Sequence, residues 1–150
     1  MNNDALTWPP ARRIMPEGLY AWTMPVSFSQ GWVCGPLLFV GGQIATGDPG
    51  VAVASDDIEE QTRIVFENIG KVLEEAGTSF KHLVKFNTYY VFDGPDDELQ
   101  EYWEKMTRVR LQYLPSPGPA GTAVRVSGLA YPGLLLEVEA IAYDPSLVQS

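Results

Sequence analysis

Apolar residues recur at helical spacing between residues 57 and 76, while charged residues occupy the opposite side of the same stretch. The apolar series is Ile58, Thr62, Val65, Ile69, Val72, Leu73 and Ala76. Asp56 followed three residues later by Glu59 is typical of a helix start, and Gly77 is typical of a helix end. The pattern predicts an amphipathic helix over residues 57–76 that packs one face on a flat partner such as a sheet.

A second helix is predicted after the turn-forming residues 94–97 and before the Pro- and Gly-rich segment 116–121. Its inner side is marked by Leu99, Tyr102, Trp103, Met106, Val109, Arg110 and Tyr113.

Five segments are rich enough in β-branched, aromatic and aliphatic residues to predict strands. Residues 31–34 and 37–44 flank Gly35-Pro36, which favours a hairpin, and residues 82–92 form a third strand. Residues 122–130 and 134–143 flank Tyr131-Pro132-Gly133, which favours a second hairpin. Prolines interrupt residues 1–26, which we interpret as an N-terminal arm preceding one domain at residues 27–150, with regular structure beginning after the arm.

The order of these elements predicts an α+β two-layer domain, in which two helices cover one face of a mixed β-sheet. Apolar residues occupy both alternating sets of positions in residues 134–143, so part of that strand is expected to be buried on both sides. Two helices cannot cover both faces. We therefore expect the second face to pack against other copies of the chain in a homo-oligomer.

Composition narrows the possible functions. The 150 residues carry a formal net charge of -9, which disfavours nucleic acid and anionic membrane surfaces as partners. One cysteine, Cys34, and one histidine, His82, exclude an internal disulfide and a zinc cluster, and no metal or other cofactor is expected. No apolar run approaches the ~20 residues of a membrane span, and the N-terminus lacks a signal-peptide pattern, so a cytoplasmic location is the default expectation.

Charged residues within predicted strands are the main candidates for chemistry. Arg125 lies among apolar residues, and Glu137 and Glu139 share one face of the last strand. A structural ion pair between Arg125 and one of the two glutamates is one interpretation, and a ligand-binding role is the other. We expect His82 to be a surface histidine and Cys34 a small apolar filler.

The tryptophans of the N-terminal part, Trp8, Trp22 and Trp32, either pack on a neighbouring subunit or form the wall of a cleft.

Four segments of the sequence, in this order, resemble the RidA/YjgF family of reactive-intermediate deaminases. They are SFSQGWVCGPLLFVGGQIA, IEEQTRIVFENIGKVLEEAG, HLVKFNTYYV and AVRVSGLAYPGLLLEVEAIA, and the resemblance extends from Ser27 to Tyr143. It implies a chorismate-mutase-like fold, a homotrimer and ligand sites in clefts between subunits.

The resemblance also implies roles for individual residues. Arg125 would hold the substrate carboxylate through a bidentate pair, and Glu137 would hold or activate water, leaving Glu139 structural. Backbone groups at Gly41 and Gly42 would line the cleft.

Three further positions differ from the pattern of the family. Ser127 stands where many relatives have cysteine, and Phe28 replaces a common tyrosine. Trp103 stands where asparagine is common, and it either faces the cleft or is a core residue.

The resemblance predicts hydrolysis of a carboxylate-bearing 2-imino or enamino acid to a 2-keto acid and ammonia. The alternative is a non-catalytic trimer that binds a small carboxylate. A ribonuclease activity is disfavoured by the acidic charge balance.

Overall fold

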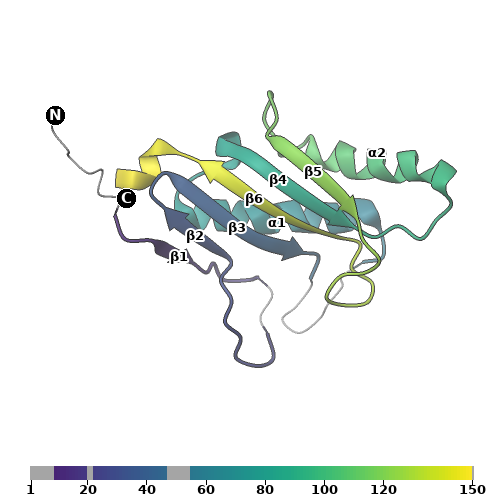
Figure 1. The fold of residues 1–150 in the computed structure, drawn as a ribbon, viewed down its shortest axis with the longest axis horizontal. Coiled ribbons are helices and arrows are strands. Elements are labelled where there is room, and N and C mark those ends of the chain that lie inside the picture. Colours follow the sequence, from purple (N-terminus) through teal and green to yellow (C-terminus); the bar gives the residue numbers. More distant parts are fainter. Residues whose placement is uncertain (1–8, 20–21, 47–54, 150) are drawn as a thin grey trace.

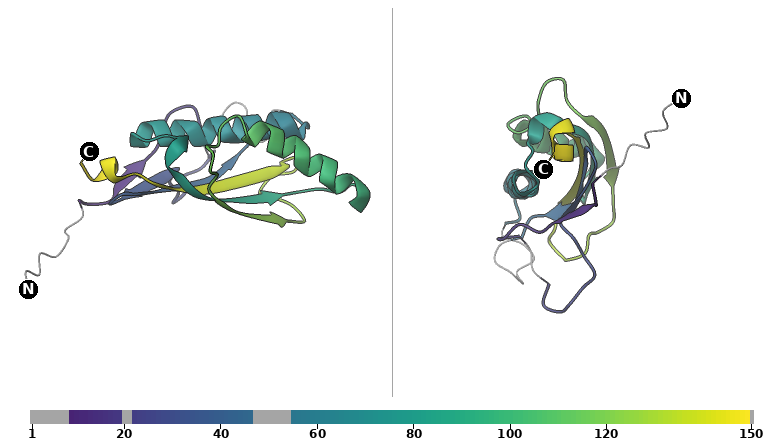
Figure 2. Two further views of the ribbon diagram at one scale, coloured as in Figure 1. Left: turned by 90° about the horizontal axis from the view of Figure 1, so that it is seen from above. Right: turned by 90° about the vertical axis from the view of Figure 1, so that its left-hand side faces the viewer.

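The computed structural model describes residues 9–19, 22–46 and 55–149, and these form a six-stranded sheet with two α-helices on one face (Figures 1 and 2). The helices are α1 (Ile58–Ala76) and α2 (Leu99–Arg110). The strands are β1 (Arg12–Ile14), β2 (Gly31–Cys34), β3 (Leu37–Ile44), β4 (Leu83–Tyr90), β5 (Ala120–Arg125) and β6 (Leu136–Tyr143). The two-layer α+β architecture is as predicted.

The strand order is β1-β2-β3-β6-β4-β5, so β6 lies in the middle of the sheet between β3 and β4 (Figure 1). Neighbouring strands are antiparallel except β4 and β5, which are parallel. The connection between β4 and β5 contains α2, because a parallel pair needs a crossover of about a dozen residues or more.

The predicted C-terminal hairpin is wrong. β5 and β6 are not neighbours, since β4 pairs with both, and β5 ends at Arg125 rather than at residue 130. A second difference concerns residues 1–26, where Arg12–Ile14 form an edge strand paired with β2. Trp8 lies outside the described residues.

Helix α1 ends where its sequence predicts, but its N-cap is Asp57 rather than Asp56. The Asp57 side chain caps the first turn by accepting a 2.8 Å hydrogen bond from the Glu59 backbone N–H. Gly77 adopts φ 89° in the left-handed region, and its N–H donates to the Glu74 carbonyl, which ends the helix.

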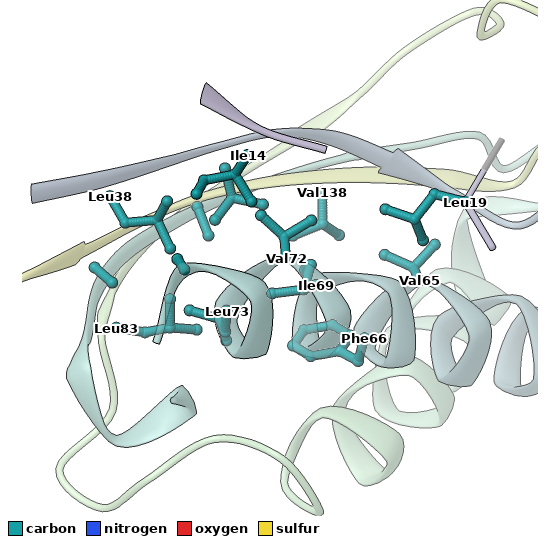
Figure 3. Close-up of a cluster of buried hydrophobic side chains, with 14 of the residues drawn as sticks. Ile14, Leu19, Leu38, Val65, Phe66, Ile69, Val72, Leu73, Leu83 and Val138 are labelled. Carbon is teal, nitrogen blue, oxygen red and sulfur yellow. The ribbon is translucent and has the colours of Figure 1, made fainter. Parts of the chain in front are cut away.

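The hydrophobic core lies between α1 and the sheet (Figure 3). Leu38 and Val138 from the sheet and Ile69 and Val72 from the helix all lie in this layer, and all four are essentially inaccessible to solvent. Alternate β6 residues supply this surface, because side chains at every second position of a strand share a face. Phe66 extends the core by packing on Phe80 and Tyr113, at centroid distances of 6.3 and 5.6 Å.

The sheet face opposite the helices carries exposed aromatic residues. Trp32 and Phe39 are cross-strand partners, Phe39 also pairs with Ile141, and Tyr143 lies near the end of the same face. Trp32, Phe39 and Tyr143 are each between 41% and 49% exposed. No helix of the described residues covers this apolar face (Figure 2).

A polar cluster joins the end of β6 to the segment after α1. The Asp144 carboxylate accepts hydrogen bonds from Thr78 Oγ1 at 2.6 Å and from the Ser146 N–H and Oγ, and lies 2.8 Å from His82 Nδ1. Burial by itself would raise the pKa of Asp144, but these hydrogen bonds and His82 lower it to about 2. His82 is therefore a partly exposed structural residue, in agreement with the prediction.

Candidate functional site

A small pocket of about 70 Å³ lies beside the N-terminal end of β6 and the bulged end of β3. Its lining includes Trp22, Phe28, Gly42, Asn68, Ala130 and Glu137. Three residues predicted for the site, Phe28, Gly42 and Glu137, are thus brought together by the fold. We call this the Glu137 pocket.

The Glu137 side chain occupies space that Gly42 leaves open. The β3–β6 register shifts between Val40 and Gln43, so Gly41 and Gly42 form an irregularity in the strand. A β-carbon at Gly42 would overlap Glu137 Oε1 and approach its Cδ to 2.9 Å. Only glycine at position 42 lets the carboxylate lie against the backbone.

The environment of Glu137 favours the protonated form of its carboxyl group. Burial is the main cause that raises its pKa, and the negative charge of Glu139 raises it further. Within the described part of the chain, no side chain forms an ion pair or a hydrogen bond with this carboxylate. A half-buried carboxyl group that has a raised pKa and no bonding partner among the described side chains is suited to exchange protons with a ligand.

Glu139, two residues further along β6, is held by its neighbours. Its Oε1 accepts hydrogen bonds from Asn87 Nδ2 at 2.9 Å and from Tyr89 Oη at 3.1 Å. The hydrogen bond to Glu139 is also the main cause that raises the pKa of Tyr89. This bonding agrees with a structural role for Glu139.

Two buried glutamines brace the strand irregularity. Gln43 Nε2 donates to Gln30 Oε1 at 2.8 Å and to the Gly41 carbonyl at 3.1 Å. Asn68 of α1 donates to the Ile44 carbonyl at 3.2 Å and ties the same segment to the helix. Sequence reasoning missed these residues, because an isolated amide side chain in a strand or helix carries no periodic signal.

Aromatic rings form one wall of the Glu137 pocket. Trp22 packs edge-on against Phe28 at 6.2 Å and lies 6.1 Å from Tyr131. Trp22 therefore forms part of a pocket wall, one of the two roles considered for it. Gly41 instead borders a neighbouring hollow of about 350 Å³ on the open sheet face, together with Trp32 and Phe39.

Arg125 does not pair with Glu137 or Glu139, which corrects the structural ion pair considered above. Arg125 is the cross-strand partner of Tyr90, which in turn partners Leu136, so Arg125 lies on the helix side of the sheet. Its guanidinium donates to the Phe92 carbonyl at 3.1 and 2.6 Å and pairs with Asp96 at 3.3 Å.

Ser127 and Trp103 also lie outside the Glu137 pocket. Ser127 is exposed in the segment after β5. Trp103 is partly buried on the helix side, where it packs on Tyr90 at a centroid distance of 5.5 Å. Within one chain, the predicted site residues therefore divide between the two faces of the sheet.

The described residues contain no cluster of three or more His, Cys, Asp or Glu side chains that could hold a metal ion. No helix among residues 9–19, 22–46 and 55–149 is long and apolar enough to cross a membrane.

Comparison with known proteins agrees with this architecture. The family model described as endoribonuclease L-PSP matches residues 21–144. A RutC family protein of Pyrococcus abyssi is 40% identical over 116 residues, which cover 77% of this chain and 85% of that protein.

Two solved structures share the fold. RidA from an Antarctic Psychrobacter has a TM-score of 0.72 and 28% identity, covering 88% of this chain and 98% of that one. A YjgF/YER057c/UK114 family member from Mycobacterium tuberculosis has a TM-score of 0.64 and 31% identity, covering 79% and 87%.

The fold is an α+β domain of the type seen in these relatives. The chain belongs to the endoribonuclease L-PSP family, which is also the RutC and RidA/YjgF family.

Proposed function

We propose that this protein is an imine or enamine deaminase that hydrolyses a small carboxylate-bearing 2-imino acid in the Glu137 pocket. One observation carries the proposal: the half-buried Glu137 carboxyl has a raised pKa and lies against the bare backbone of Gly42, without an ion-pair partner among the described residues. Membership of the RidA/YjgF family supports it.

The proposed reaction needs one proton-transfer group. Glu137 accepts a proton as water adds to the carbon of the C=N bond, and it returns this proton to the nitrogen. In the resulting carbinolamine, Glu137 takes the hydroxyl proton and passes it to the amine nitrogen as the C–N bond breaks, which releases ammonia and leaves a 2-keto acid. A raised carboxyl pKa helps the return step, because it makes the protonated form of Glu137 more accessible.

The substrate carboxylate needs a cation, and no cation forms an ion pair with Glu137 among the described residues. We propose that Arg125 of a neighbouring copy supplies it, in a homotrimer whose clefts lie between subunits. The exposed apolar sheet face around Trp32 and Phe39 is a surface that such an assembly would bury. Ser127 would approach the same cleft from the segment after β5.

The test generates 2-iminopropionate and 2-iminobutyrate in situ with an amino-acid oxidase and measures keto-acid formation. We expect acceleration by the wild-type protein, a large loss in Glu137→Gln and Arg125→Ala, and full activity in Glu101→Gln, which alters an exposed carboxylate on α2. Wild-type rates from a folded Glu137→Gln variant would exclude the proposed mechanism.

A second candidate is a trimer that binds a small carboxylate without turnover. The absence of a hydroxyl at Phe28, on the wall of the Glu137 pocket, favours it, because one hydrogen-bonding group is lost there. Binding of 2-oxobutyrate without acceleration of imine hydrolysis would support this candidate over the deaminase.

A further inference from the structure

Arg110 is a buried cation at the C-terminal end of α2. The residue is 8% exposed, and its guanidinium carbon lies 4.5 Å from the Trp103 ring centroid and 5.6 Å from that of Phe86. Its Nη2 donates to Thr107 Oγ1 at 2.7 Å. The two aromatic rings hold the planar group through cation–π contacts.

This guanidinium has no acidic partner among the described residues. Buried charges in proteins are normally paired, because the loss of hydration has to be offset. An arginine carries five N–H donors, and a single side-chain hydrogen bond from Arg110 is present. Burial also lowers the pKa of Arg110. The group is therefore held in place with most of its donors available.

A pocket of about 190 Å³ opens beside the guanidinium, lined by Phe86, Trp103, Arg110, Gly121, Thr122 and Ala123. We call it the Arg110 pocket. Its strand side is built from small residues of β5, and a β-carbon at Gly121 would come within 3.3 Å of Phe86. Bulkier side chains on this strand would fill the space in front of Arg110.

The Arg110 pocket and the Glu137 pocket lie on opposite sides of the sheet. Gly121 pairs with Phe86, which pairs with Ala140, and Ala140 is one of the β6 residues that face the helices. Glu137 has the opposite parity on the same strand and faces away from the helices. A ligand beside Arg110 would thus be separate from the proposed deamination within one chain.

We infer that the Arg110 pocket binds the carboxylate of a small monoanion with an apolar body. A guanidinium fork matches the two oxygens of a carboxylate, and the Trp103 and Phe86 rings offer flat apolar surface to the rest of the molecule. A single cation among apolar walls is poorly suited to a more highly charged and strongly hydrated ion such as phosphate.

Isothermal titration calorimetry on the full chain tests this inference, with benzoate as the probe and benzamide as its uncharged counterpart. We expect benzoate to bind and Arg110→Met to weaken it about tenfold or more, because the charge-assisted hydrogen bonds are lost. Benzamide and inorganic phosphate should bind more weakly than benzoate by a similar factor.

Three controls separate the possible sites. Arg108→Met removes an exposed arginine two residues away on the same helix and should leave benzoate affinity unchanged. Arg125→Ala and Glu137→Gln, which disable the proposed deaminase, should leave unchanged the component of benzoate binding that Arg110→Met removes. Loss of benzoate binding in Arg125→Ala with retention in Arg110→Met would overturn the inference.

A second variant guards against misfolding of Arg110→Met. Ala123→Leu adds bulk to the exposed edge strand at the wall of the Arg110 pocket without altering the arginine. It should weaken benzoate binding while the thermal unfolding midpoint stays close to that of the wild type. The inference is wrong if the wild-type protein binds no benzoate, or if Ala123→Leu binds it with wild-type affinity.

Discussion

Gly42 and Glu137 are in direct contact across strands β3 and β6, and the carboxylate of Glu137 occupies the volume that a side chain at position 42 would need. Gly42→Ala should therefore displace the carboxylate and reduce imine hydrolysis nearly as much as Glu137→Gln. Steady-state kinetics on a 2-imino acid measures the loss. Gly128→Ala is the matched control, since a β-carbon there meets nothing within 4 Å. Equal activity of the two alanine variants would contradict the proposed role of the contact.

The negative charge of Glu139 contributes to the raised pKa of Glu137, although burial is the larger cause. Glu139→Gln should lower the pKa of Glu137 toward its ordinary value of 4.5 without reaching it. A pH titration of the carboxyl carbons by ¹³C NMR measures this value. No change in the pKa of Glu137 would show that the two carboxylates do not interact.

The raised pKa of Glu137 also makes the free energy of unfolding depend on pH. Because the folded state holds the Glu137 proton more tightly than the unfolded state, Glu137 makes the free energy of unfolding fall as pH rises from the unfolded to the folded pKa. Glu137→Gln should remove this fall, which denaturant unfolding across that pH range would detect.

Asp144 makes the free energy of unfolding rise with pH, because its pKa is lowered to about 2 from an ordinary 3.8. Its contribution to stability is fully present above pH 3.8 and is lost as pH falls through about 2. Asp144→Asn should thus reduce the loss of stability between these pH values, measured by urea unfolding. Asp97→Asn, at an exposed position, is the control and should leave the acid dependence unchanged.

The exposed aromatic face of the sheet should mediate self-association. Phe39→Glu places a charge between Trp32 and Ile141, its cross-strand partners, and should convert the proposed trimer to monomers. Light scattering coupled to size-exclusion chromatography gives the mass of each species. Leu111→Glu, on the helix side at 70% exposure, should remain trimeric. A trimeric Phe39→Glu variant would show that another surface forms the interface.

Phe66 anchors the core beneath α1, where it contacts the rings of Phe80 and Tyr113. Phe66→Ala should reduce the free energy of unfolding by about 3–5 kcal/mol, because it removes a fully buried ring and leaves a cavity. Leu111→Ala should cost less than about 0.5 kcal/mol, as expected for an exposed side chain. Chemical denaturation of the two variants provides the comparison.

Much of the fold could be predicted from local pattern. Helix α1 and strands β2 and β3 lie where their periodicity and turn residues place them, since these signals are contained within each segment. The pairing of β5 could not be predicted in this way. Tyr131-Pro132-Gly133 favours a hairpin locally, but α2 provides the crossover that places β5 parallel to β4. Strand β1 is three residues long and carries too little hydrophobic signal to be recognised.

In the candidate site, too, features within one segment could be predicted, whereas the arrangement of distant segments could not. Glu137 could be singled out because a carboxylate in an apolar strand is unusual, whereas Gly42 was indicated by the family resemblance. The placement of Arg125 on the other side of the sheet depends on strand register, which sequence spacing does not reveal. Arg110 was predicted on the inner side of its helix, but the absence of an acidic partner became visible only in three dimensions.

The central position of β6 affects how the protein is made. The ribosome synthesises β6 after the five other described strands, yet both β3 and β4 pair with it. Until residues 136–143 leave the exit tunnel, a nascent chain exposes the unpaired edges of β3 and β4, which are templates for aggregation. Closure of the sheet is therefore a late event in biosynthesis, and a chaperone that shields strand edges would act on the chain before that event.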